Sequence, residues 1–175
     1  MTLFGALVLL NLGALLVAGK LPLHGKKGVT APFLERARGD LALVFFGFPG
    51  CSRSCPLTLH RLSDAYPRLR DHYPGLEVFF VNLQPVPDSE RTHAYIRAHD
   101  PRFKGVAPAE DALARLSREF GAWLYRMGEG SEPFHNPYVY VLGRGDRGWR
   151  IRARIPAGER VIAGIRRALP PPRAG

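Results

Sequence analysis

The fold is decided by the stretch Phe46–Pro56, FGFPGCSRSCP, which contains both cysteines of the 175-residue chain, Cys51 and Cys55. A continuous apolar run, Leu41–Phe48, leads into it and predicts a buried β-strand. If a helix begins near Pro56, the two cysteines, spaced i and i+4, lie on one face of a helical turn and point at one spot. The helix N-terminus would then lower the pKa of both thiols. Two convergent thiolates bind a soft metal or cycle through a disulfide, and this stretch leaves both open.

Helical and strand patterns alternate along the rest of the chain. Pro67 lies inside the first predicted helix and predicts a kink or an early end there. A helical crossover joins the first two strands, which should be parallel, and a tight turn at 143–148 joins the last two, which should be antiparallel. This order is typical of an α/β, thioredoxin-like fold, a central mixed sheet flanked by helices. Before the first strand we predict a small hairpin over Leu21–Val29 and a helical turn within Ala31–Asp40. After it we predict a helix over Pro56–His72, a strand over Leu76–Leu83 and a helix from Asp88 or Ser89 to about His99. The remaining predicted elements are a helix over Ala109–Arg126, strands over Tyr138–Leu142 and Trp149–Ile155, and a helix over Ala157–Leu169.

An uncharged apolar run, Leu3–Ala18, precedes the domain. As a helix it would span about 24 Å, a little less than a hydrocarbon core of about 30 Å. It predicts a retained hydrophobic anchor helix in preference to a cleaved signal peptide. Lysines follow the run and none precedes it, which on the positive-inside rule alone would place the domain in the cytoplasm. The predicted division is a membrane anchor or signal segment at 1–20, a thioredoxin-like domain at 21–169 and a flexible tail at 170–175.

The composition, 46% hydrophobic and 23% charged, is that of a globular domain with an appendage. Two cysteines are too few for a disulfide scaffold or for a zinc site built from cysteine alone. The formal net charge is +10, but the arginines are scattered and no nucleic-acid-binding motif accompanies them, so no nucleic acid partner is expected. A basic surface of this kind suits an anionic bilayer or an acidic protein.

Six histidines are candidates for a third ligand, and His135 differs from the others. It lies in Glu132–Pro137, just before the third long strand, where the chain of a thioredoxin-like fold packs against the cysteine loop. Pro137 occupies the position where such folds carry a cis-proline beside the thiols. A loop histidine bonded only to backbone is the alternative interpretation. The other five histidines are expected at the surface: His24, His60, His72, His93 and His99.

Three sequence features together carry a family resemblance. They are the strand end and cysteine motif at 44–59, VFFGF followed by CxxxCPLTL; the segment AHDPRF at 98–103 with Gly105 after it; and His135 before the late strand. With these features the chain resembles the SCO/SenC family, thioredoxin-like copper chaperones for cytochrome c oxidase assembly. The resemblance extends from about His24 to the C-terminus.

The resemblance implies that Cys51, Cys55 and His135 bind copper, and two thiolates with an imidazole suit Cu(I). A set of two cysteines and one histidine could also hold zinc with an open fourth position. The resemblance further implies a membrane-anchored metallochaperone whose domain faces the periplasm or, in mitochondria, the intermembrane space. The implied partner is the copper-site subunit of cytochrome c oxidase.

Two other hypotheses stay open: a thiol–disulfide oxidoreductase acting through the Cys51–Cys55 pair, and a membrane-tethered binding module with an incidental disulfide. The sequence also departs from the family pattern. Gln84 and Phe134 stand where the family has acidic residues, and Arg53 lies between the cysteines, where an acidic residue is common. We expect Arg53 to lower the pKa of the thiols and to repel a cationic metal.

Overall fold

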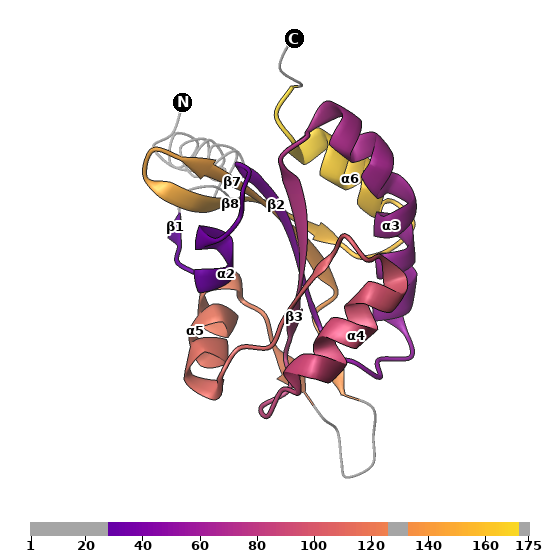
Figure 1. The fold of residues 1–175 in the computed structure, drawn as a ribbon, viewed down its shortest axis with the longest axis vertical. Helices are drawn as coiled ribbons and strands as arrows, with labels where there is room; N and C mark the ends of the chain where they lie inside the picture. Colours follow the sequence, from indigo (N-terminus) through magenta and orange to yellow (C-terminus); the bar gives the residue numbers. More distant parts are fainter. Residues whose placement is uncertain (1–27, 126–132, 172–175) are drawn as a thin grey trace, which may run out of the picture.

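The structure, a computed structural model, describes residues 28–125 and 133–171. Its main sheet has six strands (Figure 1): β1 (Gly28–Val29), β2 (Leu41–Gly47), β3 (Leu76–Asn82), β4 (Lys104–Val106), β7 (Tyr138–Gly145) and β8 (Gly148–Pro156), in the order β1-β8-β7-β2-β3-β4. Two short strands, β5 (Leu124–Tyr125) and β6 (Phe134–His135), form a separate antiparallel pair. The helices are α2 (Pro32–Glu35), α3 (Ser54–His72), α4 (Ser89–His99), α5 (Glu110–Phe120) and α6 (Val161–Ala168).

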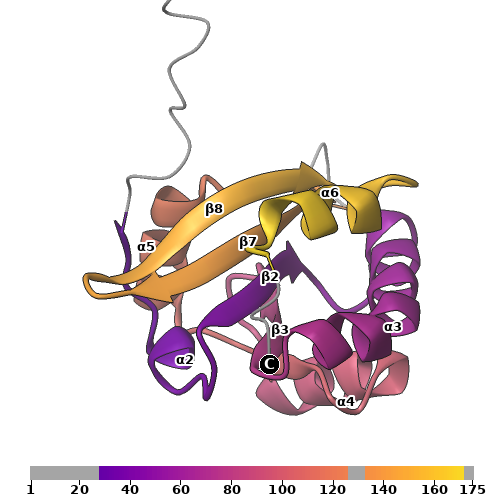
Figure 2. The ribbon, with the colours of Figure 1, turned by 90° about the horizontal axis from the view of Figure 1, so that it is seen from above.

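Helices cover both faces of the main sheet (Figure 2). On one face, residues of α3, α4 and α6 form a core cluster with Leu43 and Phe45 of β2. On the other face, α2 and α5 pack with Val44 and Phe46. Side chains alternate between the two faces of a strand, and since both faces of β2 are covered, the strand is apolar along its whole length. The predicted mixed α/β architecture is confirmed.

Strand directions also agree with the prediction. β2 runs parallel to β3 and antiparallel to β7, and β7 pairs antiparallel with β8. The sequence analysis missed β4, which pairs parallel with Phe79–Val81 of β3 at the edge of the sheet. Its three residues, Lys104–Val106, contain no apolar run, so periodicity carries no signal for it.

Several predicted boundaries are wrong, for local reasons. α3 begins at Ser54, before the predicted start at Pro56, and so includes Cys55. Its end at His72 is as predicted: the helix does not end early at Pro67, because its apolar face is buried in the core. α5 ends at Phe120 and not at Arg126, because Gly121 takes the left-handed conformation, φ 65°, and caps the helix. The closing helix begins at Val161, after the predicted start at Ala157.

The N-terminal predictions fall largely outside the described residues. The predicted anchor at 1–20 lies there entirely, as does most of the predicted hairpin, of which only Gly28–Val29 is described, as a strand paired with β8. Within 28–125 and 133–171, none of the helices combines the length and the apolar character that a membrane span requires.

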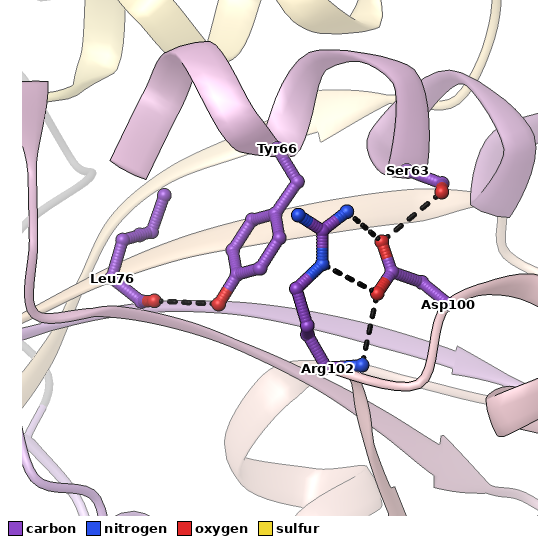
Figure 3. Close-up of polar contacts among 5 residues, drawn as sticks. All are labelled: Ser63, Tyr66, Leu76, Asp100 and Arg102. Atoms are coloured by element: carbon purple, nitrogen blue, oxygen red, sulfur yellow. Dashed lines mark hydrogen bonds and ion pairs between the residues drawn. The ribbon is translucent and has the colours of Figure 1, made fainter. Parts of the chain in front are cut away.

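The AHDPRF segment ties three elements together (Figure 3). The buried Asp100 carboxylate accepts hydrogen bonds from the Arg102 backbone N–H, 2.9 Å, from its guanidinium, 2.8 and 2.6 Å, and from Ser63 Oγ of α3, 3.1 Å. The Arg102 guanidinium lies 5.0 Å from the ring centroid of Tyr66, whose hydroxyl donates to the Leu76 carbonyl at the start of β3. These contacts stabilise the packing of α3 and α4 on the sheet.

Candidate metal centre

The two cysteines follow the C-terminal end of β2, the central parallel strand. Cys51 lies in the loop after the strand and Cys55 in the first turn of α3. Two glycines make this geometry possible. A Cβ on Gly47 would stand 2.6 Å from Cys55 Sγ and 2.9 Å from the Phe80 ring, and Gly50 has a φ of +102°, which disfavours other residues. The glycines of the FGFPGC motif therefore let the sulfur approach the strand end.

His135 reaches the cysteines from a distant part of the chain. It lies in β6, opposite Leu124 of β5, and its side chain is buried. The rings of Phe45 and Phe48 contact the imidazole edge-on, each with a centroid distance of 6.0 Å. Nδ1 lies 3.4 Å from the Asn136 carbonyl oxygen, and Nε2 faces the two sulfurs.

The three side chains converge on one point. His135 Nε2 lies 3.2 Å from Cys55 Sγ and 3.9 Å from Cys51 Sγ, and the three ligand atoms all lie within 4.8 Å of one another. Metal bonds of about 2.0–2.3 Å in a trigonal plane separate their ligand atoms by about 3.5–4.0 Å, so the observed spacing fits one bound ion. Within the described ranges, no carboxylate joins this group, and no disulfide joins the two cysteines.

The electrostatics favour a thiolate at Cys51. The Cys55 side chain hydrogen-bonds to the Cys51 sulfur and is the largest cause that lowers the pKa of the Cys51 thiol, from 9.0 to about 3. Burial opposes this effect, whereas His135 and the backbone N–H groups of Cys55 and Arg53 add to it. The last two donors belong to the N-terminal end of α3, where unpaired N–H groups stabilise an anion.

Two of the three residues that depart from the family pattern, Arg53 and Phe134, contact each other, and the third, Gln84, lies elsewhere in the sequence after β3. The Arg53 guanidinium sits over the Phe134 ring, 5.6 Å from its centroid, and both side chains are exposed. Arg53 lowers the pKa of Cys51 through its backbone. Gln84 lies beyond β3, where its backbone N–H donates to Asn82 Oδ1, 2.9 Å.

Sequence reasoning missed two residues that position His135. Ser54 Oγ lies 3.3 Å from Nε2. The buried Asn136 side chain accepts from the Trp123 backbone N–H, 2.9 Å, and donates to the Gly121 carbonyl, 2.8 Å, so it links β6 to the end of α5. An asparagine directly after the histidine is the one signal that the sequence offers for this role.

Other expectations around the site had different outcomes. The Asn136–Pro137 bond is trans, and the described part of the chain contains no cis peptide bond, so the expected cis-proline is wrong. Trans is favoured at X–Pro bonds by about 0.5–1 kcal/mol, and the Asn136 side chain holds this segment in place without the bend of a cis bond. Among the other histidines, His60, His72 and His93 are exposed, and His99 is half-buried beside Tyr95; His24 lies outside the described residues.

The sequence matches the SCO1/SenC family over residues 27–169. The SCO2-like protein RC0895 of Rickettsia conorii is 23% identical over 114 residues, which is 62% of this chain and 56% of the relative. The mitochondrial SCO2 homolog of Bos taurus is 25% identical over 140 residues, 75% of this chain and 52% of that protein. The chain thus spans little more than half the length of these relatives.

Solved structures share the fold. The solution structure of apo Sco1 from Thermus thermophilus superposes with a TM-score of 0.65 at 25% identity, covering 84% of this chain and 94% of that one. Copper-bound ScoI of Arabidopsis thaliana gives 0.64 at 15% identity, over 75% and 83% of the two chains. Copper-bound yeast Sco1 gives 0.61 at 19% identity, over 74% of each chain.

The fold and the site define a thioredoxin-like α/β domain in which two cysteines and one histidine converge beyond the end of the central strand. The chain belongs to the SCO1/SenC family.

Proposed function

We propose that this protein is a metallochaperone that carries Cu(I) on Cys51, Cys55 and His135 and delivers it to the copper site of cytochrome c oxidase. One observation carries the proposal: two sulfurs and one imidazole nitrogen, from segments 80 residues apart, lie within 4.8 Å of one another in a buried pocket of side chains. Thiolate and imidazole groups are the ligands that suit a soft metal ion, and copper-bound relatives share the fold.

The donor set favours Cu(I) over harder ions. Thiolates are soft ligands. Cu(I) accepts three ligands, which can be a mixture of sulfur and nitrogen atoms, whereas zinc would require a fourth ligand. Copper here is cargo: acceptor thiolates or imidazoles replace the three ligands one at a time. A Cys51 thiol that is ionised near pH 7 binds the ion without first losing a proton.

The location proposed for the domain is the periplasmic face of a bacterial inner membrane, with residues 1–20 as anchor. Support comes from the apolar run Leu3–Ala18 and from the family, which includes mitochondrial proteins. The net charge of +10 suits both an anionic bilayer and an acidic acceptor such as a copper-site subunit of the oxidase.

The test is anaerobic titration of the full-length reduced protein with Cu(I) against a competing chelator. We expect one tight site, lost in Cys51→Ser and Cys55→Ser and weakened at least about tenfold in His135→Ala. His60→Ala is the matched control, because His60 is exposed and contacts Asp64 at 3.4 Å, outside the ligand group. Unchanged affinity in His135→Ala would contradict the proposal.

A thiol–disulfide oxidoreductase is the second candidate, favoured by the low pKa of Cys51 beside Cys55, with no disulfide between the two. The Cys51 thiolate would attack a substrate disulfide and release one substrate thiolate. The Cys55 thiolate would then attack the mixed disulfide, leaving a Cys51–Cys55 disulfide and a substrate with two reduced thiols. Turnover on a disulfide substrate that survives in His135→Ala, without Cu(I) binding, would favour this function.

A further inference from the structure

Three large aromatic side chains are exposed together beside the metal centre. Trp123, Tyr125 and Phe134 are 50%, 62% and 41% exposed, and we call them the aromatic patch. With Leu124 they line one shallow depression of about 640 Å³ on the β5–β6 pair. Aromatic side chains grouped at the surface are typical of protein interaction sites, since each buries a large apolar area on contact.

The aromatic patch and the metal centre share their backbone. Phe134 and His135 are neighbours in β6, so their side chains leave the strand on opposite sides: Phe134 to solvent and His135 to the sulfurs. Phe134 pairs with Tyr125, and His135 pairs with Leu124. The Trp123 backbone N–H is bonded to the Asn136 side chain. A protein that docks on the patch therefore contacts the strand that carries the ligand His135.

Positive charge borders the same surface. The exposed Arg53 guanidinium lies over Phe134, and Arg91 Nη2 lies 3.7 Å from the position that a Cβ on Gly50 would take. Both arginines therefore flank the cysteine loop. Arginine beside aromatic side chains is the composition of binding hot spots, and it selects a partner with carboxylates.

We propose that the aromatic patch and Arg53 dock the copper-accepting protein, through a surface that combines apolar side chains with carboxylates around its own copper ligands. The inference rests on the proposed function. Ligand exchange requires the acceptor's ligands to come within bonding distance of an ion whose three ligands are buried, so the acceptor must seat itself beside the cysteine loop. A patch of three aromatic residues suits the small interface of a transient transfer complex.

The experiment compares two acceptors of Cu(I) from the loaded full-length protein. One is the soluble copper-site domain of a cytochrome c oxidase subunit, and the other is glutathione, which needs no docking. We expect the double variant Trp123→Ala/Tyr125→Ala to slow transfer to the domain about tenfold or more, with unchanged transfer to glutathione and unchanged Cu(I) affinity. The conservative Trp123→Phe/Tyr125→Phe should retain most of the rate.

Charge reversal at Arg53 tests whether this arginine helps to dock the acceptor. Arg53→Glu should slow transfer to the domain, and added salt should reduce the difference from the unmodified protein. Arg147→Glu makes the same change of charge at the exposed β7–β8 turn and should leave the rate as it was.

Of the two tryptophans, Trp149 is 1% exposed, so a shift in fluorescence on mixing with the copper-free domain reports contact at Trp123.

The outcomes separate the two proposals. Equal transfer rates to the domain for the unmodified protein and Trp123→Ala/Tyr125→Ala would overturn the docking surface and leave Cu(I) binding intact. So would an unmodified protein that binds Cu(I) but transfers it no faster to the domain than to glutathione. Absence of Cu(I) binding by the unmodified protein would overturn the proposed function, and the docking proposal with it.

Discussion

Nε2 of His135 lies 3.2 Å from Sγ of Cys55, although 80 positions of sequence separate the two residues. The contact depends on the sheet, because β2 delivers the cysteine loop and the segment that leads into β7 delivers the histidine, and these two strands are paired. A change that disturbs either end of this pair is therefore expected to separate the ligands.

Cys51 should remain ionised in strongly acidic solution. Its pKa lies near 3, so the ultraviolet absorbance of one thiolate in the reduced protein should persist from neutral pH down to about pH 3 and then disappear. Between pH 3 and pH 9 the unfolded chain holds this proton and the native protein does not, so the residue's contribution to the free energy of unfolding rises with pH across that window.

The control for this titration is Cys55→Ala. It removes the side-chain hydrogen bond that lowers the pKa of Cys51 most, so the thiolate absorbance should fade at a higher pH than in the unmodified protein. A midpoint near 8.5, the value of a free thiol, in the unmodified protein would contradict the described geometry of the two sulfurs.

Gly47→Ala should disturb the centre although it replaces none of the three ligands. The added methyl group would stand 2.6 Å from Cys55 Sγ and 2.9 Å from the Phe80 ring, and neither can retreat, because both are buried. We expect a loss of about 1–3 kcal/mol in the free energy of unfolding and weaker Cu(I) binding. Denaturant unfolding and the chelator titration measure the two effects.

Gly145→Ala is the matched control for that substitution. Gly145 also lies in a strand of the main sheet, but nothing stands within 4 Å of the position of its Cβ. It should change neither stability nor metal affinity by much. Equal behaviour of the two alanine variants would show that Cys55 does not need the space at Gly47.

Asp100→Asn should lower stability and spare metal binding. The carboxylate is buried and accepts four hydrogen bonds, two of them from the half-exposed Arg102 guanidinium. We expect a loss of about 1–2 kcal/mol at pH 7, with unchanged Cu(I) affinity. Asp146→Asn, at the exposed β7–β8 turn, is the control and should have little effect.

The same variant carries a pH signature. Burial, the largest single cause, would raise the pKa of Asp100, but the hydrogen bonds to its carboxylate from Arg102 and Ser63 together outweigh it and hold the pKa below its ordinary value. Its contribution to stability is therefore complete above the unfolded value, about 3.9, and is lost as the pH falls through the lower native value. The difference between the unmodified protein and Asp100→Asn should shrink below about pH 4; a difference that stays constant down to pH 2 would contradict this role.

Asn136→Ala should loosen the segment that carries His135. The variant loses bonds to the Trp123 N–H and the Gly121 carbonyl, so β6 is no longer fastened to the end of α5. Cu(I) affinity should fall by about tenfold, as is usual when a group that orients a ligand is removed. Cys51–Cys55 disulfide formation should remain, since the Asn136 side chain bonds to the backbone of Trp123 and Gly121 and to the Tyr140 hydroxyl. An affinity equal to that of the unmodified protein would limit Asn136 to a structural role.

Local sequence signals predicted the elements that bury continuous apolar runs. The sequence predicts strands over Leu41–Phe48 and Leu76–Leu83 because both segments are continuously apolar, as a strand covered on both faces must be. The helical crossover between them makes the two strands parallel. The i, i+4 spacing of Cys51 and Cys55 and the position of His135 before a late strand were also enough to nominate the three residues that the structure brings together.

The remainder depends on contacts between distant residues. β4 is an edge strand of only three residues, too short to show a periodic pattern. β5 and β6 have two residues each and are separated in the sequence, so neither gives a local signal of its pairing. Asn136 acts through backbone groups of Gly121 and Trp123, which only the folded chain brings near. Arg53 was expected to act through its charge, but its guanidinium lies over Phe134 and its backbone N–H faces the thiolate.

X-ray absorption spectroscopy of the Cu(I)-loaded protein would show whether His135 binds the metal, because it identifies and counts the atoms bound to copper. We predict two sulfur ligands and one imidazole nitrogen, and loss of the nitrogen in His135→Ala with both sulfurs retained. Two sulfurs alone in the unmodified protein, or a spectrum that His135→Ala leaves unchanged, would contradict the assignment of His135 as a ligand.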